Sequence, residues 1–198
     1  VDMLDTLLPE GDLVSATYHD GHTEVLGTSD ADEVNLPMVV ITNENAASAA
    51  ELFAQAIKDY NKGRTVGTQT YGKGVMQTIY PLSDGGALSI TVAKYNPPKS
   101  ENFDGVGVKP DYAVQLTAEQ QRNFYELDEE TDPQLKKALE LAEAVIKTGG
   151  FDGLSEIPES SSEEETEEDT SSEEETASEE TSSEEESSEE SSSEDEAA

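Results

Sequence analysis

The chain has 198 residues and a formal net charge of −35 at pH 7, from 46 acidic and 11 basic residues. This balance leaves no basic patch to meet phosphates, which excludes nucleic acid as a partner. The absence of cysteine excludes disulfides and thiolate metal sites, and no apolar run approaches the roughly 18 residues that a membrane span needs.

The negative charge is concentrated at one end of the chain. Residues 155–198 hold 21 of the 46 acidic residues and none of the basic ones, which leaves a net charge of −14 for residues 1–154. We therefore expect a globular domain over 1–154 and a disordered Ser/Glu-rich acidic tail over 155–198, because the tail lacks apolar side chains to offset its ordering entropy. We interpret the tail as a solvated spacer, with weak divalent-cation binding or wall association as the alternative.

The first half of the domain predicts a helix, a hairpin, a strand and a second helix. The chain opens without Met and inside a helical pattern over 1–8, so we expect it to be the C-terminal part of a longer protein. The stretch "LVSATYHDGHTEVL" (13–26) alternates around an Asp-Gly turn, which is typical of a hairpin. The apolar run 36–42 indicates a strand covered on both faces, and 48–62 indicates a helix with Gly63 as its C-cap.

The second half predicts more strands and a last helix. "RTVGTQTYGKG" (64–74) indicates a short strand and a glycine-rich loop, and residues 75–95 form a second hairpin pattern. A capping box stands at 117–120, and Asp132 and Pro133 begin the last helix. We expect the inward face of that helix to comprise Leu135, Leu139, Ala142 and Ile146. Strands that alternate with helices predict an α/β class built on a mixed sheet.

One serine stands alone among alanines where the strand predicted at 36–42 leads into the helix predicted at 48–62. It is Ser48 in "VVITNENAASAAELFAQAI" (39–57). A hydroxyl there projects from the rigid end of a sheet, and the first N–H groups of the helix can hold the oxyanion of an acyl-transfer intermediate. The alternative is that Ser48, Asn43 or Asn45 only caps the helix.

A nucleophilic serine also needs a base. His19 and His22 lie at a hairpin tip, where we expect them to be exposed and far from Ser48; with Asp20 they make only a weak metal pair. The lysines that we expect to be solvated are Lys58, Lys62, Lys136, Lys137 and Lys147.

Lys73 differs from these lysines because it lies between two glycines that lead into an apolar strand. Burial there would favour its neutral form and make it a general base. A surface loop lysine is the alternative. Gln77 follows four residues later and shares a face with Lys73 if the strand is regular, so its amide could orient the lysine or the serine.

Three stretches together resemble the C-terminal processing peptidases, also called tail-specific proteases. They are "VVITNENAASAAELFAQAI", "GRTVGTQTYGKGVMQTIYPLSDGGALSITVAKY" and "DGVGVKPD", and "DPQLKKALELA" is similar to the helix that commonly follows them. The resemblance covers about residues 1–150 and implies a ClpP/crotonase-like fold, a mixed sheet with flanking helices. It also implies a PDZ domain and a glycine-rich oxyanion turn upstream of Val1.

The resemblance assigns roles to individual residues. It implies that Ser48 is the nucleophile, Lys73 its base and Gln77 the residue that assists the lysine. Serines that the family commonly has two places either side of the nucleophile are Ala46 and Ala50 here. We expect the Ala49 N–H to be the oxyanion donor that this chain retains.

These inferences lead to a serine endopeptidase that cleaves flexible or unfolded proteins near apolar C-termini, weakly active as this fragment alone. The alternative is a non-catalytic cell-surface interaction module that keeps the protease fold; an acyl-CoA enzyme lacks an evident nucleotide site. No metal or organic cofactor is implied. We expect an extracytoplasmic bacterial location and protein or peptide substrates, and leave open a membrane anchor before Val1 and a homo-oligomer.

Overall fold

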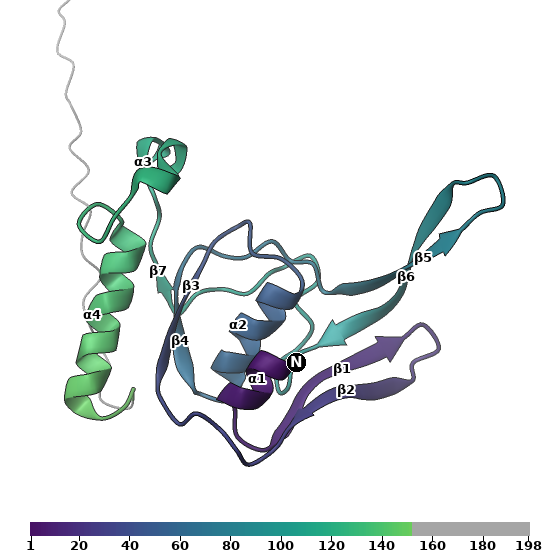
Figure 1. Ribbon diagram of the computed structural model, residues 1–198, viewed down its shortest axis with the longest axis horizontal. Helices are drawn as coiled ribbons and strands as arrows, with labels where there is room; N and C mark the ends of the chain where they lie inside the picture. The colour runs from purple at the N-terminus through teal and green to yellow at the C-terminus, as the bar shows by residue number, and fades with distance from the viewer. Residues whose placement is uncertain (152–198) are drawn as a thin grey trace, which may run out of the picture. The chain divides into compact units, whose positions relative to one another are not determined.

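A computed structural model describes residues 1–151 of the chain. In chain order the elements are α1 (Asp2–Leu7), β1 (Gly11–Tyr18), β2 (Thr23–Ser29), β3 (Met38–Thr42), α2 (Ala49–Asp59), β4 (Gly63–Gly67), β5 (Val75–Pro81), β6 (Ala87–Asn96), β7 (Tyr112–Ala113), α3 (Ala118–Arg122), the 3-10 helix η1 (Phe124–Glu126) and α4 (Pro133–Thr148). The expected α/β class is confirmed (Figure 1). The predicted acidic tail lies outside the described residues.

The strands form two sheets instead of the single mixed sheet that we expected. One sheet has the order β2-β1-β6-β5 and is antiparallel throughout, and the other has the order β3-β4-β7 and is parallel. Both predicted hairpins are confirmed as β1–β2 and β5–β6, and they join edge to edge because β1 pairs with β6. Figure 1 shows the β5–β6 hairpin as an arm that extends past the tip of β1–β2.

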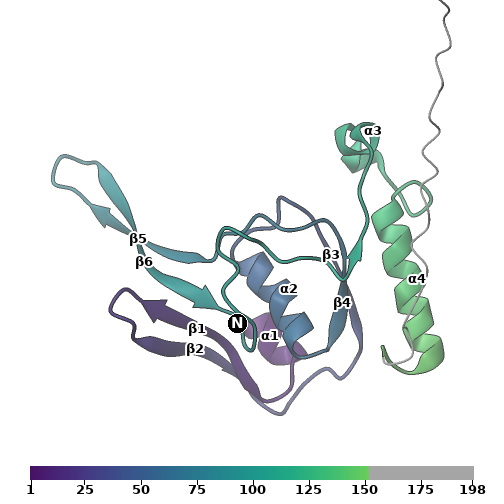
Figure 2. The same ribbon diagram turned by 180° about the vertical axis from the view of Figure 1, so that it is seen from behind.

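The parallel sheet is covered by one helix on each face, as Figures 1 and 2 show. Met38 and Val40 of β3 pack toward the cluster that contains Ile57 of α2, whereas Val39 packs toward Leu141 of α4. Alternate residues of a strand point to opposite faces, so β3 is covered on both sides as predicted. Ile41, near the end of the strand, is nevertheless exposed.

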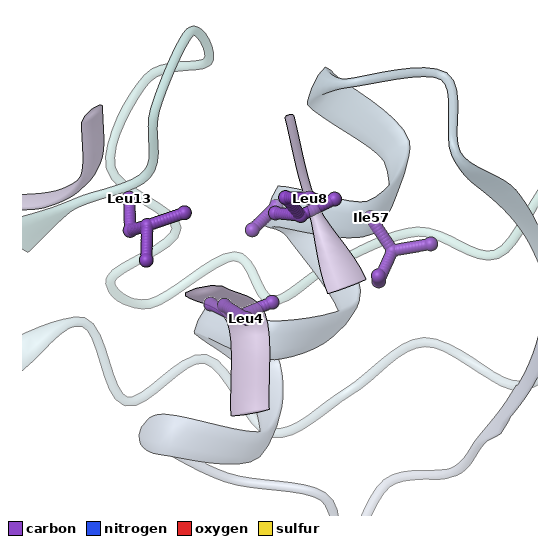
Figure 3. Packing of buried hydrophobic residues seen from close by; sticks show 5 residues of the cluster. Leu4, Leu8, Leu13 and Ile57 are labelled. Atoms are coloured by element: carbon purple, nitrogen blue, oxygen red, sulfur yellow. The ribbon is translucent and has the colours of Figure 1, made fainter. Parts of the chain in front are cut away.

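One buried cluster joins α1 to α2. It comprises Leu4, Leu8, Leu13, Ala56 and Ile57, and Figure 3 draws the cluster with Leu4, Leu8, Leu13 and Ile57 labelled. A second cluster on the other side of α2 comprises Val14, Leu52, Ala54, Phe103 and Val108. Apolar contacts on both sides hold α2 in place, and with it the N-terminus of this helix, where Ser48 lies. No helix within residues 1–151 combines the length and the apolar character that a membrane crossing requires.

The predicted role of Gly63 as the C-cap of α2 was wrong. Helix α2 ends at Asp59, and Asn61, with a φ of 53°, makes the left-handed turn that we assigned to Gly63. Gly63 is the first residue of β4, where a Cβ would lie 2.5 Å from the Met38 carbonyl oxygen. Its small size therefore serves close strand approach instead of helix termination.

The inward face of α4 is also not the one that we expected. Leu139 and Ile146 are exposed, and the buried residues are Gln134, Ala138, Leu141 and Val145. The helix has apolar residues on two adjacent stripes, so periodicity alone fits either one. Packing against Val66 selects the second stripe, and the Gln134 amide donates to the Val114 carbonyl at 2.9 Å, which satisfies this buried polar group. The Asp132 cap and the capping box at Thr117 are both confirmed.

Candidate active site

Ser48 ends the loop that carries the chain from β3 into α2. Its backbone has φ 57° and ψ −113°, and among the non-glycine residues in the described part of the chain only Asn61 shares a positive φ. Such a conformation is strained for a residue with a Cβ and persists only where the surroundings hold it. A strained serine between a strand and a helix is typical of nucleophiles.

Ser48 is also the N-cap of α2, so the alternative role of a helix cap fits its position. It forms a capping box with Glu51, in which the Ser48 N–H donates to Glu51 Oε2 at 2.8 Å. The same capping box pairs the Ser48 hydroxyl oxygen, as acceptor, with the Glu51 N–H, although not as a cap hydrogen bond of regular geometry, so the hydroxyl proton is not used by the cap. Asn43 and Asn45 do not cap the helix, because its N-cap is Ser48; the Asn43 side chain instead accepts from the Asn45 N–H within the loop at 3.0 Å. The hydroxyl thus remains available for chemistry.

Ala49 is the first helical residue after Ser48 and is exposed. Its N–H donates to no backbone carbonyl within residues 1–151, as the start of a helix requires. An oxygen developing negative charge beside Ser48 would meet this N–H at the positive end of the α2 dipole.

Lys73 lies in the loop between β4 and β5, and its side chain is exposed. The structure thus confirms the alternative of a surface loop lysine and not the burial that would favour its neutral form. The lysine that the fold does bury is Lys62, with 8% of its side chain exposed and an ion pair to Glu33 at 2.7 Å, although we expected it to be solvated. The flanking glycines serve backbone approach to another loop and do not enclose the Lys73 side chain.

The loop of Lys73 packs backbone to backbone against residues 103–108, the "FDGVGV" stretch. Gly72 has a φ of 92°, and a Cβ there would lie 2.9 Å from the Gly107 nitrogen. The Gly105 N–H donates to the Gly72 carbonyl at 2.9 Å, and the Gly74 N–H donates to Asp104 Oδ1 at 3.2 Å. Two stretches that are about 30 residues apart in the chain thus form one rigid support.

Gln77 lies on β5 opposite Thr91 and is exposed. The register with β6 shifts between Met76 and Gln77, so the regular alternation that would put Lys73 and Gln77 on one face does not hold. The structure does not bring Gln77 into a hydrogen bond with Ser48 or Lys73 within residues 1–151.

A residue that we did not single out brings Ser48 and Lys73 together. The N–H groups of both donate to Glu51 Oε2, each at 2.8 Å, so the two backbone nitrogens are at most twice that distance apart. No hydrogen bond joins the Ser48 hydroxyl to the Lys73 ammonium in the part of the chain that the structure describes. Glu51 could have been noticed as the fourth position of the "SAAE" capping box, but its reach to Lys73 depends on tertiary structure.

A second carboxylate fixes the loop before Ser48. The N–H of Glu44 and the hydroxyl of Thr68, which donates at 2.8 Å, hold the pKa of Glu44 below its usual range. An open cavity of about 520 Å³ adjoins this loop and is lined by Asn43, Glu44, Asn45, Thr68, Leu116, Gln121, Phe124, Tyr125 and Gln134. Ser48, Ala49 and Lys73 are not among the residues that line it.

His19 and His22 lie at the tip of the β1–β2 hairpin, on different elements from Ser48, Glu51 and Lys73. Both are exposed, and the His22 ring stacks on Tyr18 with centroids 6.1 Å apart. Within residues 1–151 no group of three or more His, Cys, Asp or Glu side chains is arranged to hold a metal ion.

Comparison with known proteins identifies the class. A carboxyl-terminal-processing protease of Synechocystis sp. is 33% identical over 141 residues, which are 71% of this chain and 32% of that protein. The chloroplastic C-terminal processing peptidase of Tetradesmus obliquus is 37% identical over 121 residues, 60% of this chain and 25% of that protein. Among solved structures, the photosystem II D1 C-terminal processing protease matches with a TM-score of 0.53 at 34% identity, over 58% of this chain and 30% of its own.

The resemblance to C-terminal processing peptidases is thereby confirmed. The chain spans about a third or less of the length of these relatives. The model of one family, described as peptidase family S41, matches residues 1–114. The chain therefore belongs to peptidase family S41.

Proposed function

We propose that this chain carries the Ser48/Lys73 dyad of a serine endopeptidase that cleaves flexible or unfolded proteins near apolar C-termini. The observation that supports it best is the shared carboxylate oxygen: Glu51 Oε2 accepts from the N–H groups of both Ser48 and Lys73. The strained Ser48 backbone at the start of α2 adds to this support. We extend the proposal to the ClpP/crotonase-like arrangement of the whole protein.

The proposed chemistry is acyl transfer in two steps. Lys73 takes the proton of the Ser48 hydroxyl as the serine oxygen attacks the scissile carbonyl. This step needs the uncharged amine, and hence a more enclosed setting for Lys73 than its exposed position here. The Ala49 N–H donates to the resulting oxyanion, and the amine leaves with a proton from Lys73. Water, activated by the same lysine, then releases the acyl group. Gln77 would orient the lysine, which requires a movement of β5 from the register seen here.

The relatives support the substrate class. The names of three of them specify processing of carboxyl termini, in one case that of the photosystem II D1 protein. Chain ends are flexible, so a protease that cleaves near them needs an open approach to the nucleophile, and Ala49, next to Ser48, is exposed. The comparisons do not favour the alternative of a non-catalytic module.

The remaining parts of the proposal concern the setting of the protein. We propose an extracytoplasmic location in bacteria, substrates that are proteins or peptides, and no nucleic-acid partner, in keeping with the net charge of −35. We propose no cofactor. The 198-residue chain by itself should be weakly active.

The test uses the longest natural protein that contains this chain and two disordered peptides of equal length. One peptide ends in apolar residues and the other in aspartates. We expect cleavage of the first only, its loss in Ser48→Ala, and an unchanged rate in His19→Ala and His22→Ala, which alter exposed residues. Cleavage that persists in Ser48→Ala, or equal cleavage of both peptides, would contradict the proposal.

A further inference from the structure

Glu51 is a buried carboxylate that the proposed chemistry does not use. It is 0% exposed, and no lysine, arginine or histidine forms an ion pair with it within residues 1–151. A buried carboxylate without a cation is costly unless hydrogen-bond donors satisfy its oxygens. A glutamate is therefore retained at this position only where its hydrogen bonds serve the fold or the site.

The donors to Glu51 come from two segments, and both segments carry a residue of the dyad. Oε2 accepts from the Ser48 N–H and the Lys73 N–H, each at 2.8 Å. Oε1 accepts from the Thr70 hydroxyl and the Gly72 N–H, each at 2.6 Å. One side chain thus fixes the turn of the nucleophile against the loop of the base.

Thr70 extends this connection to a third segment. While its hydroxyl donates to Glu51, it accepts from the Val108 N–H at 2.7 Å, and its own N–H donates to the Val108 carbonyl at 3.2 Å. Thr70 and Val108 are both buried. The "FDGVGV" segment, whose Gly107 packs on Gly72, is therefore joined to Glu51 through one hydroxyl group.

We propose that Glu51, with Thr70, is the positioning residue of the dyad, which sets the separation of Ser48 and Lys73 through their backbone N–H groups. The proposal rests on the proposed function. Its chemical basis is that only a carboxylate presents two acceptor oxygens to four donors. A glutamine of the same shape replaces one oxygen by an NH₂ donor, which leaves one pair of donors without an acceptor.

Loss of the Glu51 hydrogen bonds should therefore lower kcat more than it changes KM. Glu51 is fully buried beneath the turn, so it does not contact substrate, and a small displacement of either dyad residue lowers the rate of the chemical step by about 10²-fold. An interaction that matters only for the chemical step changes kcat and leaves KM nearly constant.

The experiment measures kcat and KM of Glu51→Gln in the longest natural protein that contains this chain. We expect kcat to fall about 10²-fold with KM within about 3-fold of the unchanged protein. The matched control is Ser29→Ala, which also removes a hydrogen bond from a buried side chain, with 5% exposure, but in β2, where the hydroxyl donates to the Leu8 carbonyl at 2.8 Å. It should lower stability and leave kcat within about 3-fold.

Two results would overturn the proposal: a folded Glu51→Gln protein with near-normal kcat, or a loss in Ser29→Ala of the same size. If Glu51→Gln does not fold, two variants of Thr70 test the same role. Thr70→Val removes one donor and should lower kcat several-fold, whereas Thr70→Ser keeps the hydroxyl and should restore it; equal kcat in both would overturn the role. Cleavage that persists in Ser48→Ala refutes the proposed function and this role together, whereas a loss in Ser48→Ala without one in Glu51→Gln refutes only the role.

Discussion

The backbone of Ser48 is strained, and the residue stands where the loop after β3 leads into α2. A residue with a Cβ at φ 57° and ψ −113° is held in a region that glycine populates far more readily. The strain is balanced by the bond from the Ser48 N–H to Glu51 and by the packing of α2 between two apolar clusters. A serine that only capped the helix would need no such conformation, because N-cap residues usually adopt extended backbone angles.

Two substitutions of Ser48 distinguish the effect of backbone strain from the effect of losing the capping hydroxyl. Ser48→Ala and Ser48→Gly both remove the hydroxyl, but only glycine relieves the strain. We expect Ser48→Gly to be more stable than Ser48→Ala by about 1 kcal/mol, after the entropy that glycine loses on folding. Urea unfolding of the two variants measures the difference. If the alanine variant is equally or more stable, the backbone of Ser48 is not strained.

At the scale of elements, the loop of Lys73 depends on the glycines that face residues 103–108. A Cβ on Gly72 would lie 2.9 Å from the Gly107 nitrogen and 3.0 Å from the Val106 nitrogen, and these backbone atoms belong to a hydrogen-bonded segment. The approach of the two loops leaves no space for a side chain. This packing, with the Thr70–Val108 hydrogen bonds, keeps the loop of Lys73 in place.

Gly72→Ala should therefore destabilise the protein by about 3 kcal/mol, from an unfavourable φ and a backbone clash together. The matched control is Gly85→Ala in the β5–β6 turn, where φ is 89° but nothing lies within 4 Å of a Cβ. It should cost only about 1 kcal/mol, from φ alone. Equal losses in denaturant unfolding of the two variants would show that the loops do not press on each other.

Elements that depend on local chemistry were predictable from the sequence. The turn at Asp20-Gly21, the capping box at Thr117 and the Asp132-Pro133 start of α4 each follow from residues within four positions of one another. Which stripe of α4 meets the sheet and what Gly63 does depend on partners that are distant in the sequence. These two predictions failed for that reason.

The candidate site divides in the same way. The position of Ser48 between strand and helix is local, and its pairing with Lys73 came from the resemblance to a family. The exposure of Lys73 and the reach of Glu51 from the Ser48 turn to the 70–73 loop depend on how α2 packs beside that loop. No spacing rule connects residues 51 and 73, so these features required the structure.

At the scale of the whole molecule, the acidic tail should be dispensable for folding. Residues 155–198 carry 21 acidic and no basic residues, so the charges repel one another and offer no apolar anchor. Deletion of this segment should shift the melting temperature by less than about 2 °C. Scanning calorimetry of the two proteins at one salt concentration measures the shift, and a larger drop would show that the tail packs on the domain.

The central claim is that Ser48 and Lys73 act as one unit, and a double-mutant cycle on kcat/KM tests it most directly. In the longest natural protein that contains this chain, Ser48→Ala and Lys73→Ala should each lower kcat/KM by at least about 10³-fold, and the double variant should be little worse than either. Lys73→Arg should also fail, because arginine does not give up its proton, and Gln77→Ala should lose less. A folded Lys73→Ala protein with near-normal turnover, or losses that multiply in the double variant, would contradict the dyad and leave Ser48 as a helix cap.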